Sequence, residues 1–103
     1  FTPGDYRIML GQSISIDILI PLTIEVLRKT PFIEADYFEG DLFLTIMRKN
    51  ERYKEFWNKN PLLKREIEFI FEINRDKLDD LQVDEDTKDN LLNTFNEFKR
   101  FPR

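Results

Sequence analysis

The chain has 103 residues, of which 41% are hydrophobic, 14% aromatic and 35% charged, and its formal net charge at pH 7 is −4. A chain this rich in aromatic residues can bury the core of one small domain. It has neither cysteine nor histidine, which excludes disulfides, zinc–thiolate sites and Cys–His or Ser–His nucleophiles. Its acidic balance argues against direct binding of nucleic acid, and we expect no cofactor.

The first part of the chain is compatible with two structures. Residues 6–12 followed by alternating isoleucines have the period of a β-hairpin with a Gly-X turn. The apolar residues from Ile14 onward also fit a helical face, and we favour a helix over about residues 15–29, kinked at Pro21. This stretch is too short and too interrupted to span a membrane, and no basic segment precedes it as in a signal peptide. Residues 1–7 are expected to be disordered or foreign to the native domain.

Helical spacing of apolar residues predicts four further helices, over residues 42–49, 51–58, 61–81 and 87–100. Asp41 and Asn50 are the expected N-caps of the first two, and Asn60-Pro61 starts the third, which should be the longest. Buried stripes are expected at Tyr53, Phe56 and Trp57 and at Leu91, Phe95 and Phe98. The predicted fold is all-α: one domain over residues 1–103, a bundle of about four to five helices.

The most unusual segment runs from Pro31 to Leu42 and places four carboxylates among aromatic side chains around one glycine. Gly40 and Asp41 suit a turn and a helix cap, but neither role requires the other acids and rings. Exposed aromatics beside carboxylates are typical of a surface that binds a basic protein. The candidate partner-binding residues are Glu34, Asp36, Tyr37, Phe38, Glu39 and Asp41. Their spacing does not fit a calcium-binding loop, so we predict no metal site.

A second acidic segment, residues 79–89, also carries six carboxylates. The simpler interpretation is a solvated connection that caps the last helix. The alternative is a second binding surface at Asp79 to Asp86.

Several motifs in order carry a resemblance to a known family. They are Tyr6–Gln12, Ile18–Leu22 leading to Val26-Leu27, Pro31, Asp36–Leu42, and Phe56-Trp57 before Asn60-Pro61. Together they resemble the small immunity proteins of bacterial contact-dependent growth inhibition systems. The resemblance implies a non-enzymatic, cytoplasmic antitoxin that binds the C-terminal toxin domain of a cognate effector. Such toxins are often nucleases, so the implied partner is a basic protein domain.

The resemblance supplies no catalytic residues, and the assignment of the contact to residues 34–41 comes from their chemistry alone. Two other functions stay open at this point. One is an adaptor that binds a partner helix in a groove, and the other is an enzyme that uses only carboxylates. A monomer is the simpler expectation for the oligomeric state.

Overall fold

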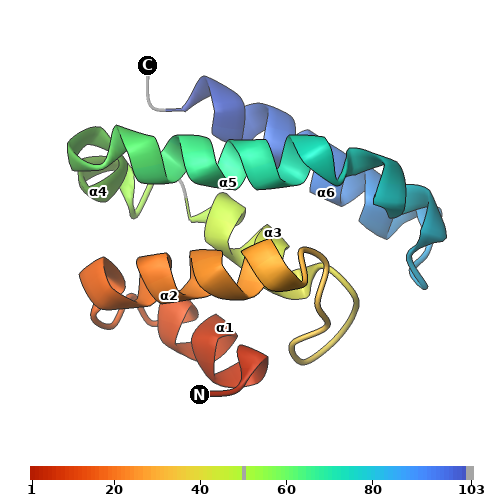
Figure 1. Cartoon of the computed structure of the whole chain (residues 1–103), viewed down its shortest axis with the longest axis horizontal. Helices are drawn as coiled ribbons and strands as arrows, with labels where there is room; N and C mark the ends of the chain where they lie inside the picture. Colours follow the sequence, from red (N-terminus) through yellow and green to blue (C-terminus); the bar gives the residue numbers. More distant parts are fainter. Residues whose placement is uncertain (50, 102–103) are drawn as a thin grey trace.

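The computed structural model describes residues 1–49 and 51–101, and within them it contains six α-helices, one 3₁₀ helix and no sheet (Figure 1). In chain order they are α1 (Pro3–Gly11), α2 (Ile16–Lys29), α3 (Asp41–Arg48), α4 (Lys54–Lys59), α5 (Pro61–Ile73), η1 (Arg75–Asp80) and α6 (Glu85–Arg100). The predicted all-α class is confirmed, with more helices than expected. None of the described helices is long and apolar enough to cross a membrane.

The N-terminal segment is helical, so the β-hairpin considered for it does not form. Thr2 and Asp5 form a capping box: the Thr2 hydroxyl accepts from the Asp5 N–H at 3.1 Å, and the Asp5 carboxylate accepts from the Thr2 N–H at 2.9 Å. Ser13 and Ser15, with φ of 55° and 48°, make the corner between α1 and α2. The isoleucine alternation here reflects a short corner followed by a helix buried on one side.

The helix α2 lies where it was predicted and carries Pro21 in its interior. The helix α3 also lies where it was predicted, but Asp41 is its first residue and Gly40 is its N-cap. Gly40 adopts φ of 93°, and a Cβ there would lie 3.1 Å from Cδ1 of Leu91. The positive φ therefore favours glycine, and a Cβ would in addition press closely on Leu91. The expected cap Asn50 lies outside the described residues.

The predicted helix over residues 61–81 is wrong in its length. It divides into α5 and the 3₁₀ helix η1 at Asn74, whose side-chain amide donates to the Ile70 carbonyl at 2.8 Å. Apolar spacings of three and four fit both kinds of helix, which is why the period alone did not reveal the break. The longest helix is α6, which begins after Asp84, whose carboxylate accepts from the Thr87 N–H at 2.8 Å.

The core lies around α3, which passes between α1 and α2 on one side and α5 and α6 on the other (Figure 1). Six of its eight residues are buried. Four aromatic rings from separate segments contact one another in this core, in two stacked pairs and one edge-to-face pair: Phe32, Phe43, Phe71 and Phe95. The predicted stripe of Leu91, Phe95 and Phe98 is fully buried, as are Tyr53 and Trp57, while Phe56 is half-buried. This packing fixes both ends of the segment that joins α2 to α3.

Candidate partner-binding site

The acidic-aromatic segment forms a compact loop between α2 and α3, drawn in yellow in Figure 1. Glu34 and Glu39 pair as an isolated antiparallel bridge, and the Gly40 N–H donates to the Ile33 carbonyl at 3.3 Å. Phe32 anchors the start of the loop in the aromatic core, where it stacks on Phe43. The loop is therefore closed at its base and presents residues 34–39 at the surface.

Asp41 holds the shape of this loop from within. Its carboxylate accepts the backbone N–H groups of Ala35 at 2.7 Å, Asp36 at 2.9 Å and Tyr37 at 2.8 Å. Burial alone would raise the pKa of Asp41, but these N–H donors outweigh it and leave the pKa below the ordinary value of 3.8. Asp41 therefore does not cap α3, as the sequence predicted, but clamps the backbone of the preceding loop.

The outer part of the loop rests on α1. The carboxylate of Asp36 accepts from Nε of Arg7 at 2.5 Å, and the guanidinium of Arg7 lies 4.7 Å from the centre of the Tyr37 ring. The backbone approaches closely as well, because a Cβ on Gly4 would lie 2.7 Å from Oδ1 of Asp36. Arg7 thus offsets one loop charge while it supports an aromatic ring that is 72% exposed.

The two acidic segments of the sequence meet in space. The carboxylate of Glu39 accepts the backbone N–H of Gln82 at 2.5 Å, which joins the loop to the connection between η1 and α6. We call the surface formed by residues 34–39 and 79–86 the acidic edge. Its carboxylates, apart from Asp36 paired with Arg7 and Glu85 paired with Lys88, are Glu34, Glu39, Asp79, Asp80, Asp84 and Asp86. The sequence presented these segments as alternatives, and the fold makes them one surface.

The six candidate residues differ in how they are placed. Glu34 and Tyr37 are exposed, and Asp36 is exposed but paired with Arg7. Glu39 is half-buried against Gln82, while Phe38 packs on the core. Asp41 is only 3% exposed, so its carboxylate faces the loop backbone rather than solvent. The arrangement can offer a partner the exposed ring of Tyr37, which rests on Arg7, together with the exposed carboxylate of Glu34.

Sequence reasoning did not find the supporting residues. Arg7 lies in a motif whose period also fits a strand, and no local pattern links it to Asp36, 29 positions later. The sequence around Gln82 predicts a solvated connection, although the Gln82 backbone N–H donates to Glu39. Such pairings arise from tertiary packing, which periodicity does not encode. Among residues 1–49 and 51–101, no three acidic side chains are grouped closely enough to hold a metal ion.

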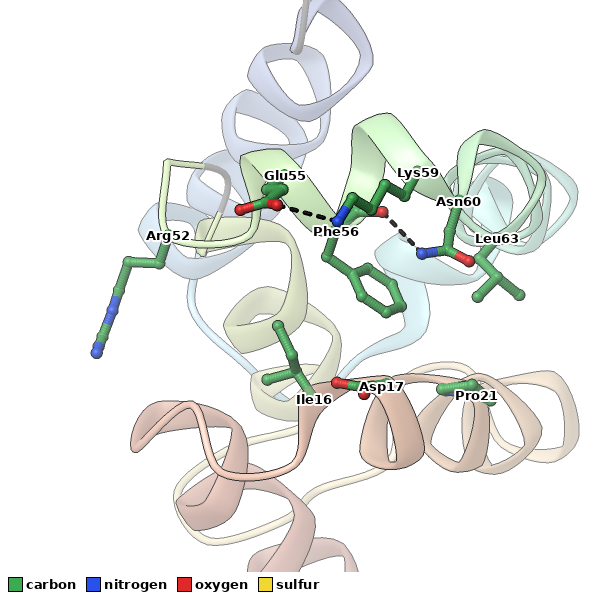
Figure 2. A pocket seen from close by; sticks show the side chains of 9 residues that line it. All are labelled: Ile16, Asp17, Pro21, Arg52, Glu55, Phe56, Lys59, Asn60 and Leu63. Atoms are coloured by element: carbon green, nitrogen blue, oxygen red, sulfur yellow. Dashed lines mark hydrogen bonds and ion pairs between the residues drawn. The ribbon is translucent and has the colours of Figure 1, made fainter.

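A separate cleft of about 470 Å³ lies between the start of α2 and the α4–α5 region (Figure 2). Phe56 projects into it from above, opposite Ile16, while Pro21 and Leu63 border it further along. Glu55 and Lys59 pair with each other at 3.0 Å on its rim. Polar and charged side chains, among them Asp17, Arg52 and Asn60, line the cleft together with these apolar residues, and the acidic loop does not contribute to it.

Comparison with known proteins places the chain in a class of binding proteins. The family model described as CDI immunity proteins matches residues 1–67, which include α1 to α4, the acidic loop and the start of α5. The chain therefore belongs to the family of CDI immunity proteins, where CDI stands for contact-dependent growth inhibition. Membership assigns it the role of an antitoxin that neutralises a toxin. No curated protein and no solved structure matches the chain.

Proposed function

We propose that this immunity protein neutralises its toxin by covering a basic, phosphate-binding surface of the toxin domain with the acidic edge. The observation that carries the proposal is the contact between Glu39 and Gln82, which unites two acidic segments on one side of the molecule. A concentrated negative surface attracts a basic partner and raises the rate of encounter. An antitoxin needs such a rate, because it must act before damage accumulates.

The toxin that best fits this surface is a nuclease. A protein that cleaves nucleic acid gathers Lys and Arg around its active site to bind phosphates. The carboxylates of the acidic edge present the same sign of charge as a phosphate backbone. Bound there, the immunity protein would block the substrate path and would need no catalytic group of its own.

Within the acidic edge, we assign the main anchor to Tyr37, with Glu34 and Glu39 flanking it. Interface energy concentrates in aromatic residues that become buried on binding, and Tyr37 exposes most of its ring in the free protein. Asp41, Asp36 and Phe38 act mainly by holding the loop in place. Because the loop is already ordered by these contacts, binding requires little further ordering of the chain.

The proposal is tested with a purified cognate toxin domain. We expect an equimolar amount of the immunity protein to abolish cleavage of nucleic acid by the toxin, and expression of the protein to protect cells. Tyr37→Ala should weaken toxin binding by about tenfold or more. The matched control is Leu62→Ala, which removes a side chain of similar exposure on α5 and should leave the affinity unchanged.

Three results separate the parts of this proposal. A toxin that is inhibited but cleaves no nucleic acid would contradict the nuclease assignment alone. Unchanged binding by Tyr37→Ala would remove the acidic loop as the contact. Failure of the protein to bind or protect against the toxin would overturn the mechanism as a whole.

A further inference from the structure

Two rows of apolar side chains lie exposed on α2 and α5, on a surface that the acidic edge does not use. They are Ile14, Ile18 and Leu22 just before and along α2, and Leu62, Phe69 and Ile73 along α5. Each is between 41% and 75% exposed. Spacings of four and seven residues place Ile18 and Leu22 on one side of α2 and the other three on one side of α5, while Ile14 lies in the corner before α2. We call the two rows together the apolar face.

The helices that carry the two rows pack side by side and run in the same direction (Figure 1). Arg28 of α2 bridges them, because its guanidinium lies 2.9 Å from a carboxylate oxygen of Glu66 on α5 and also pairs with Glu25. The Arg28 and Glu66 side chains are still 46% and 41% exposed. The rows are thus separated by a polar seam with charges of both signs, each open to a further partner.

The extent of the face argues for a protein partner. At roughly 100 Å² per side chain, each row exposes on the order of 300 Å² on its side of the seam, and the two rows together expose on the order of 600 Å². A standard interface covers about 800 Å² on each partner, so these side chains supply most of one side. The apolar face does not match a basic toxin surface, because the two rows of the face are uncharged and the seam between them carries charges of both signs.

We propose that the apolar face joins two copies of this chain into a symmetric dimer. A two-fold axis along the seam would lay α5 of one copy across α2 of the other and bring Leu62 of one row near Leu22 of the other row. The same rotation would set Arg28 of each copy opposite Glu66 of the other, so that four charges alternate in sign. Self-complementarity in both apolar area and charge is what a two-fold interface requires.

The cleft in Figure 2 lies at one end of this face and fits the same arrangement. Its walls include Pro21 from α2 and Leu63 from α5, directly next in sequence to Leu22 and Leu62. The side chain of Leu62, at 75% exposure, is available to enter the cleft of the second copy. The dimer would leave the acidic edge of each copy free, because residues 34–39 and 79–86 are not part of the face. This proposal therefore does not depend on how the toxin is bound, and it departs from the monomer expected from the sequence.

The test is the mass of the full chain in solution, measured by light scattering and sedimentation over a wide range of concentration without any toxin. We expect a species of twice 12.5 kDa that dissociates on dilution. Leu22→Lys and Phe69→Lys should each weaken self-association by about tenfold or more, because a charge is buried in the interface. Ile8→Lys is the matched control, since Ile8 is a 48% exposed residue on α1 outside the face and its replacement should leave the dimer intact. Circular dichroism should show the same helix content in all three variants.

A monomer at every concentration would overturn the proposal. A dimer that Leu22→Lys and Phe69→Lys leave unchanged would also overturn it, because the copies would then meet elsewhere. If the wild-type chain is a monomer and Phe69→Lys loses affinity for the toxin, the face belongs to the toxin and the dimer is rejected.

Discussion

At the residue scale, Asp41 fixes the binding loop through three backbone hydrogen bonds. Its carboxylate accepts hydrogen bonds from three consecutive backbone N–H groups. A side-chain amide at this position has one oxygen that can accept, but its NH₂ group would face backbone N–H groups that are also donors. Asp41→Asn should therefore lower the free energy of unfolding by about 2 kcal/mol, measured by urea denaturation. Asp36→Asn, which alters an exposed pair with Arg7, should cost much less. Equal costs for the two variants would contradict the role of Asp41 as a clamp.

The same residue predicts a pH dependence. The pKa of Asp41 is lower in the folded chain than its ordinary value of 3.8, so the folded state favours the ionised carboxylate. This contribution to stability is present in full above pH 3.8 and is lost as the pH falls through the lower folded pKa. The difference in unfolding free energy between the wild type and Asp41→Asn should shrink below pH 3.8. A constant difference across that window would mean that ionisation of Asp41 does not stabilise the fold.

At the scale of elements, Tyr53 links the two halves of the chain. Its hydroxyl is fully buried and donates to the Leu10 carbonyl of α1 at 2.5 Å, across 43 residues of sequence. Tyr53→Phe keeps the ring in the core but removes one of the two donors to that carbonyl, which still accepts from the Ser13 N–H at 3.0 Å, at a cost of about 1 kcal/mol. We expect faster amide hydrogen exchange in α1 and unchanged exchange in α6. Uniform acceleration in both helices would indicate loss of global stability rather than release of α1.

The elements also mark what the sequence can and cannot predict. The helices α2, α3 and α6 follow from apolar spacing and end signals, because each buries one continuous stripe. The N-terminal hairpin failed as an alternative because the capping box at Thr2 and Asp5 outweighs a weak strand pattern. The break at Asn74 was missed because η1 continues nearly the same spacing as α5. Local signals therefore located most helices but not the change from α-helix to 3₁₀ helix.

At the scale of the whole molecule, the sequence identified the acidic loop but not its setting. The high density of acidic and aromatic residues between Pro31 and Leu42 is evident from the sequence alone. The support from Arg7, the clamp by Asp41 and the contact with Gln82 depend on where α1 and α6 pack. These contacts convert a flexible-looking acidic segment into one side of a broader, ordered surface. The family, in contrast, was accessible from motif order alone, and the match over residues 1–67 confirms it.

The central claim is that the acidic edge makes the first contact with the toxin, and the association rate constant as a function of salt measures this most directly. Stopped-flow measurements would compare the wild type with Glu34→Gln/Glu39→Gln, which removes two charges from the edge and keeps an acceptor for Gln82. The matched control is Glu51→Gln/Glu97→Gln, which removes two exposed charges near α4 and the end of α6. We predict that the edge variant associates about tenfold more slowly at low salt and with a shallower salt dependence, while the control stays near the wild type. Equal rates and salt slopes for the two double variants would contradict the account.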